Sequence, residues 1–197
     1  PDEDTLADIT LKHSIIRHSA QAGLVAYNSD VVGENLLVMN SGSSSVINAA
    51  GGFYRYTHCT FVNTPNSFST SDPAAIFTNS LVLSDQSEIS SHLYLALENC
   101  VIWGSSDNDL WSYDNEKAGW TSSIRHNLIH SNTPLSDNFV FFDPLIPLFQ
   151  DIVQYNYELD SGSVAIDLGL SSTVWDDLRG RPRDERPDLG AYEKLNP

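Results

Sequence analysis

Short apolar runs that end in Asn, Ser or Thr recur along the first 132 residues, and helical periodicity is hard to find among them. Five of these runs align with one another, and the spacings between their second positions are 21, 24, 41 and 27 residues. Cycles of this length are typical of solenoids, in which each turn of the chain stacks on the previous one. The second positions are Ser14, Asn35, Cys59, Cys100 and Asn127.

A second class of short apolar runs lies between the members of the first class, at 23–28, 45–48, 75–79 and 110–113. The 41-residue gap contains only one of them, so we assign to it one coil with a polar insertion at 84–91. The pattern predicts an all-β, right-handed parallel β-helix of about five coils over residues 1–132. An irregular closing segment of the same domain is expected over 133–197. A β-sandwich is the competing fold, but the sequence has no Asn-Gly or Asp-Gly hairpin dipeptide.

A small polar residue at the same point of every coil can hydrogen-bond along the axis of a stack, because adjacent strands lie about 4.8 Å apart. Ser14, Asn35, Cys59, Cys100 and Asn127 are predicted to form this structural ladder. Cys59 would then lie directly over Cys100. Two buried thiols are the simpler interpretation, and a disulfide also fits the spacing. The first coil starts without a cap for its open edge, so we expect earlier coils to precede Pro1.

Charge and hydropathy narrow the classes of partner. The chain carries 26 acidic and 10 basic residues, for a net charge of −16, which disfavours nucleic acid and anionic lipid. Such a charge attracts cations or simply keeps an extracellular protein soluble. No apolar run of 18 residues is present, so no transmembrane segment is predicted.

Five motifs follow in order over residues 142–193, among them 163–169 (SVAIDLG) and 187–193 (PDLGAYE). The series resembles the end of bacterial pectin-lyase-like β-helix surface proteins of the choice-of-anchor Q type, which are similar to Bacteroidetes surface proteins. Val164, Leu168 and Arg179 depart from that pattern. The resemblance implies export to the cell surface, outside the bacterial outer membrane. It also implies structural roles in the closing motifs for Asp143, Asp167, Arg183, Asp188, Gly190 and Tyr192.

Candidate chemistry is sparse, and we predict no catalytic residue. The Asp residues of the C-terminal third are interpreted as caps of backbone N–H groups or partners of Arg. No HExxH or CxxC motif indicates a metal site, so we expect no cofactor. The acidic loop 107–114 could bind calcium, but its spacing does not match a known calcium-binding motif. Aromatic residues could stack on sugars where exposed, or fill the core where buried, and we expect at least two of four to be buried. The four are Trp103, Trp111, Tyr113 and Trp120.

These observations favour a non-enzymatic extracellular or cell-surface module. It would be a stalk, a surface that binds extracellular polysaccharide or a partner protein, or a subunit of an envelope complex. The alternative is a polysaccharide lyase or glycoside hydrolase whose active site lies on earlier coils or in the Asp-rich end. Carboxylates that converge in a groove together with Arg or Lys would favour the alternative.

Overall fold

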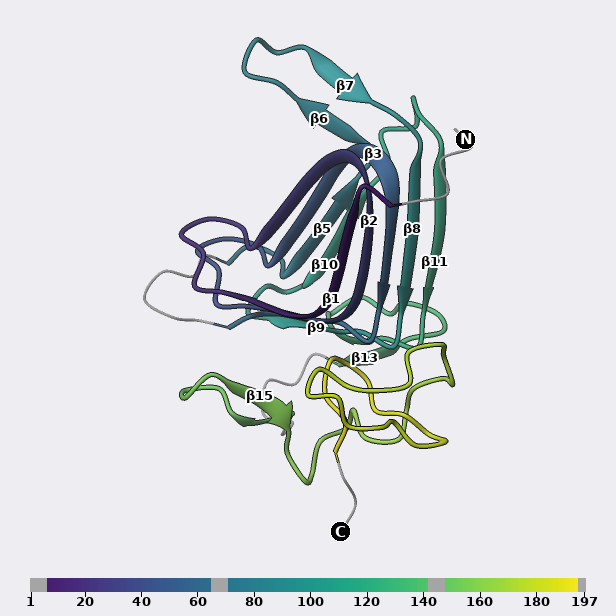
Figure 1. Ribbon diagram of the computed structural model, residues 1–197. Helices are drawn as coiled ribbons and strands as arrows, with labels where there is room; N and C mark the ends of the chain where they lie inside the picture. Colours follow the sequence, from purple (N-terminus) through teal and green to yellow (C-terminus); the bar gives the residue numbers. More distant parts are fainter. Residues whose placement is uncertain (1–6, 65–70, 142–147, 195–197) are drawn as a thin grey trace.

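The computed structural model describes residues 7–64, 71–141 and 148–194 (Figure 1). These residues form strands, turns and loops without any helix, so the all-β class is confirmed, and none of them forms a helix that could cross a membrane. The strands are β1 (Ile9–Arg17), β2 (Leu24–Met39), β3 (Val46–Thr57), β4 (Thr60–Asn63), β5 (Ala75–Thr78), β6 (Ser80–Val82), β7 (Glu88–Ser90), β8 (Leu93–Glu98), β9 (Val101–Gly104), β10 (Leu110–Tyr113), β11 (Trp120–Arg125), β12 (Leu128–His130), β13 (Phe139–Phe141), β14 (Phe149–Asp151) and β15 (Asn156–Leu159).

One curled sheet of 11 strands makes up most of the molecule (Figure 1). Every strand pair in this sheet is parallel. The two small additional sheets, β6–β7 and β14–β15, are antiparallel. A parallel sheet that curls on itself is the arrangement expected for a β-helix or another solenoid.

The register divides the curled sheet into three rows of strand segments. Row A joins 24–27, 46–49, 75–78 and 110–113. Row B joins 9–12, 29–34, 52–57, 93–98 and 120–125. Row C joins 14–17, 36–39, 60–63, 101–104, 128–130 and 139–141. The long strand β2 runs through all three rows and turns each corner at an Asn with a left-handed backbone, Asn28 with a φ of 46° and Asn35 with a φ of 49°.

Inward-pointing side chains from the three rows meet in a shared apolar core. Its fully buried aromatic members include Tyr56 from row B, Phe61 from row C and Phe77 from row A. The Tyr56 ring packs edge-on against Phe61, with 5.1 Å between the ring centroids. The Tyr56 hydroxyl donates a hydrogen bond of 2.8 Å to the Asn48 side chain, so its polar end is satisfied inside the core.

The corner between rows B and C repeats one backbone conformation. The corner residues have φ angles between 45° and 56°, in the left-handed region. Asn and His adopt this region more readily than most residues with a side chain, and every corner position is one or the other. We call this set the corner column: His13, Asn35, His58, Asn99 and His126.

The 41-residue gap corresponds to one step between adjacent strands. Thr60 of β4 lies opposite Val101 of β9, which places Cys59 beside Cys100. Part of the additional length forms the β6–β7 hairpin, which projects from the body of the molecule (Figure 1). This hairpin contains the segment 84–91 that was expected to be an insertion.

The closing segment, residues 148–194, lies along the outer side of row C (Figure 1). It therefore covers a side of the sheet and not an end of the stack. From β2 onward, outward side chains of row C are apolar and buried beneath it, among them Leu37, Val62, Val101 and Leu128, whereas Ile15 on β1 is 51% exposed. The covered strands are consequently buried on both faces, which explains why they are continuous apolar runs.

Candidate binding surfaces

The predicted ladder is displaced by one residue at its second member. Leu36 is in register with Ser14, and Asn35 belongs to the corner column. Cys59 and Cys100 are free, buried thiols. Burial, together with the neighbouring Cys100 thiol, raises the pKa of Cys59 well above its ordinary value. At the far end, the side-chain oxygen of Asn127 accepts the Cys100 N–H at 2.9 Å, so Asn127 bonds along the axis as expected of a ladder residue.

Side chains of the corner column fasten the closing segment to the sheet. Asn35 donates from its amide nitrogen to the Asp176 carbonyl at 2.8 Å. Asn99 makes two hydrogen bonds with the backbone of Leu170, at 2.8 and 2.9 Å. His13 lies 3.1 Å from the Asp176 carboxylate. The repeated Asn and His residues thus serve two purposes, since they also permit the left-handed corner.

Arg183 is the central charged contact between the closing segment and the sheet. Its side chain is only 3% exposed and pairs with Glu193 at 2.9 Å. It also donates to the Asn35 side chain at 2.8 Å and to the Gly190 carbonyl at 2.9 Å. Burial raises the pKa of Glu193 and lowers that of Arg183, which is the expected effect of removing water from both charges.

The other closing-motif residues also have structural contacts. Asp188 accepts the N–H groups of Asp167 and Lys194, at 2.8 and 2.6 Å. Gly190 has a φ of +88° and lies so close to Thr60 that a Cβ atom would come within 2.6 Å of its hydroxyl. The Tyr192 ring is buried beneath the Arg179 guanidinium. Asp143 lies outside the described residues.

Asp177 shows most clearly how the Asp-rich end is used. Its buried carboxylate accepts the backbone N–H groups of Arg179, Arg181 and Glu193, and it also pairs with the Arg181 side chain. Burial alone would raise the pKa of Asp177, but these hydrogen bonds outweigh burial and hold the pKa below its ordinary value. Such a carboxylate is committed to the fold and is a poor candidate for proton transfer to a ligand.

The histidines of the corner column do not converge on a metal. His13, His58 and His126 are separated by Asn35 and Asn99, so consecutive histidines are two steps apart. Within the described residues, no group of three or more His, Cys, Asp or Glu side chains could hold a metal ion. Burial, and then the charge of Arg183, lower the pKa of His58 well below its ordinary value.

A buried carboxylate–histidine pair, Asp109 and His130, lies at the acidic loop 107–114. Asp109 is fully buried, and its carboxylate lies 2.6 Å from Nδ1 of His130. Burial raises the pKa of Asp109, against the opposing effect of His130. The His130 ring in turn packs against Trp103, with 5.0 Å between the centroids. This pair anchors the loop before β10.

The four candidate sugar-stacking residues divide into two buried or half-buried and two exposed. Trp103 is buried under the closing segment, and Trp120 packs against the core. Trp111 and Tyr113 are 43% and 50% exposed. Both project outward from β10 in row A, and their rings are nearly parallel, with 16° between the planes and 5.9 Å between the centroids. We call them the aromatic pair.

A groove that the sequence analysis missed runs between the outer face of row B and the loop 171–174 of the closing segment. Its cavity measures about 420 Å³, and its charged lining residues are Glu34, Arg55, Glu98 and Arg125. The only sequence signal is a row of in-register outward positions, occupied by Lys12, Glu34, Thr57, Glu98 and Arg125. The opposite wall comes from more than 40 residues further along the chain, so local patterns cannot reveal it.

No protein-family model matches the chain, and no curated protein matches its sequence.

Proposed function

We propose that this chain is part of a right-handed parallel β-helix of about five coils, in a non-enzymatic module on the bacterial cell surface. The curled parallel sheet supports a β-helical architecture. The ordered motifs of residues 142–193 support a relationship with choice-of-anchor Q surface proteins. In this proposal the module is a rigid stalk whose row A surface binds neutral extracellular polysaccharide.

The aromatic pair carries this proposal. Two exposed, nearly parallel rings on one strand present apolar faces on which sugar rings can stack, and exposed aromatics of this kind otherwise cost solubility. Outward Val25 and the exposed Tyr27 lie on the same row and extend the surface across the strands. The net charge of −16 disfavours polyanions, so the fitting ligand is an uncharged glycan.

Affinity electrophoresis in gels that contain a soluble β-glucan, a xyloglucan or an α-mannan tests this proposal. We expect at least one polymer to retard the protein, and Trp111→Ala and Tyr113→Ala to abolish the retardation. Trp175→Ala is the matched control, because Trp175 is 76% exposed but belongs to the closing segment. Equal retardation of the wild type and of Trp111→Ala would contradict the proposal, as would the absence of any retardation.

A polysaccharide lyase or hydrolase is the second candidate, favoured by the groove. Glu34 and Glu98 are two strands apart in register, a backbone separation of about 9 to 10 Å, with Thr57 between them and Arg55 two residues before Thr57 on the same strand. Carboxylates in inverting glycosidases are separated by a comparable distance of about 6.5–9.5 Å. New reducing ends or unsaturated products, formed by the wild type and lost in Glu98→Gln, would establish this function in place of the first.

A further inference from the structure

The groove beside row B combines one free cation with charges that are already paired. Glu34 binds Lys12 at 2.8 Å, and Glu98 binds Arg125 at 2.6 Å. Arg55 points outward from β3, where it lies between Val32 and Ala96 in register. It is two residues before the position that lies between Glu34 and Glu98. In the part of the chain that the structure describes, Arg55 has neither an ion pair nor a side-chain hydrogen bond.

The groove is locally neutral, although the molecule as a whole is strongly acidic. Arg55 and Arg125 contribute two positive charges to its lining, and Glu34 and Glu98 contribute two negative ones. Glu34 is also paired with Lys12 from outside the lining, so both carboxylates are neutralised by other cations than Arg55. Charges elsewhere on the surface are screened beyond about 8 Å at physiological salt, so an anion in the groove experiences mainly these local charges, despite the net charge of −16.

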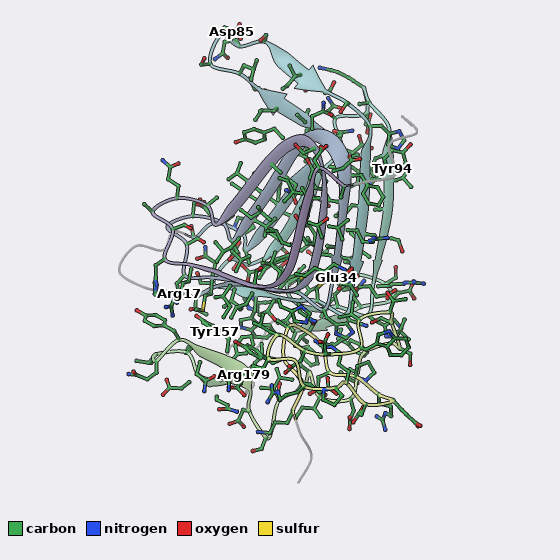
Figure 2. All side chains as sticks on the ribbon, viewed as in Figure 1. Arg17, Glu34, Asp85, Tyr94, Tyr157 and Arg179 are labelled. Atoms are coloured by element: carbon green, nitrogen blue, oxygen red, sulfur yellow. The ribbon has the colours of Figure 1, made fainter. Side chains whose placement is uncertain are left out.

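The walls of the groove add hydroxyl groups on both sides. Thr57 and Ser123 come from row B, and Ser171, Ser172 and Thr173 come from the closing segment. In Figure 2, Glu34 of the groove lining lies near the closing segment, and Tyr94 lies further toward the β6–β7 hairpin. A ligand in this position meets one guanidinium and a polar, hydrogen-bonding enclosure.

We propose that the groove is a binding site for a carboxylate-bearing small ligand, with the Arg55 guanidinium as its anchor. The planar guanidinium offers parallel N–H donors that match the two oxygens of a carboxylate, and neither neighbouring carboxylate occupies them. The hydroxyl walls select ligands whose remaining groups are polar. This site lies on row B and is independent of the aromatic pair on row A, so either proposal can fail without the other.

Ligand titrations, monitored by calorimetry and by NMR, test the site with two kinds of carboxylate. The first arm uses glucuronate with glucose as its neutral counterpart, and the second uses acetyl-alanyl-alanine with its C-terminal amide. We expect saturable binding of at least one carboxylate and at least tenfold weaker binding of its neutral counterpart. The arm that binds identifies whether the ligand is a sugar acid or a peptide terminus.

Variants at Arg55 assign the binding to the groove. Arg55→Gln should weaken carboxylate binding by about tenfold or more, and Arg55→Lys should weaken it less, because the charge remains but the paired donors are lost. Arg17→Gln is the control, since Arg17 is exposed on β1 away from the groove (Figure 2). The proposal is overturned if neither carboxylate saturates the wild type, if the neutral counterparts bind equally well, or if a folded Arg55→Gln or Arg55→Lys protein binds as tightly as Arg17→Gln.

Discussion

Rows A and C both present apolar side chains on the outside of the sheet, but among the described residues the closing segment covers row C from β2 onward and leaves Trp111 and Tyr113 of row A exposed. Val62 on row C is fully buried under the closing segment, whereas Val25 on row A is 43% exposed. In row C the closing segment completes a second apolar cluster around Leu37, Met39 and Tyr157, and Tyr157 lies on the side of the closing segment that faces the sheet (Figure 2). In row A the outward positions on the last strand, β10, are occupied by the aromatic pair, which remains exposed.

The difference shows that an apolar outer face in this chain has two distinct uses. Where polar corner residues such as Asn35 and Asn99 flank the apolar face, they supply hydrogen bonds that a covering segment needs. Row A has exposed aromatic rings in place of such a covering segment. Apolar burial stabilises row C, whereas the rings of row A gain no such stabilisation and are available for the proposed binding.

The largest expected effect comes from breaking the charged contact that holds the cover on row C. Arg183→Met should lower the free energy of unfolding by about 3 to 5 kcal/mol, because Glu193 stays buried without its cation. Chemical denaturation at pH 8 measures this loss. The loss should shrink at pH 4, because burial already raises the pKa of Glu193 and its protonation removes the unpaired charge. Arg186→Met, at an exposed position, should change stability little, and an equal loss in both variants would contradict this account.

Substitution of two glycines tests how much the close contact between the closing segment and row C contributes to stability. Gly190→Ala should cost about 2 to 4 kcal/mol, because the new Cβ meets Thr60 and Val101 in addition to a strained φ of +88°. Gly180→Ala has a similar φ of +76° but no atom within 4 Å of the new Cβ, so it should cost only about 1 kcal/mol. Thermal unfolding of both variants separates steric contact from backbone strain. Equal costs would mean that the closing segment yields readily at Gly190.

The smallest expected effect comes from making the same Val→Ala substitution in row C and in row A, which compares the two rows directly. Val62→Ala on row C should lower the free energy of unfolding by about 2 kcal/mol, since the side chain is fully buried. Val25→Ala on row A should change it by less than about 0.5 kcal/mol. Denaturant titration of the two variants side by side is the measurement. A large loss at Val25 would show that row A is covered in solution, for example by self-association.

Repetition in the sequence was sufficient to predict an all-β parallel stack, because each strand pairs with the strand one cycle away. The alignment failed at Asn35 because it matched polar residue types, whereas the register follows the left-handed corner one residue earlier. The recurrence of Asn and His at those corners was the available signal. The location of the closing segment and the groove beside Arg55 could not be predicted, since both depend on contacts between distant segments.

The hydrogen bond between Asn35 and Arg183 joins residues that are 148 positions apart in the chain. Contacts of this length form slowly, because the chain between the two residues must first be brought into place. Until residues 148–194 dock, the outward apolar side chains of row C face water. Docking of the closing segment is therefore also the step that protects an apolar sheet surface from association with other chains.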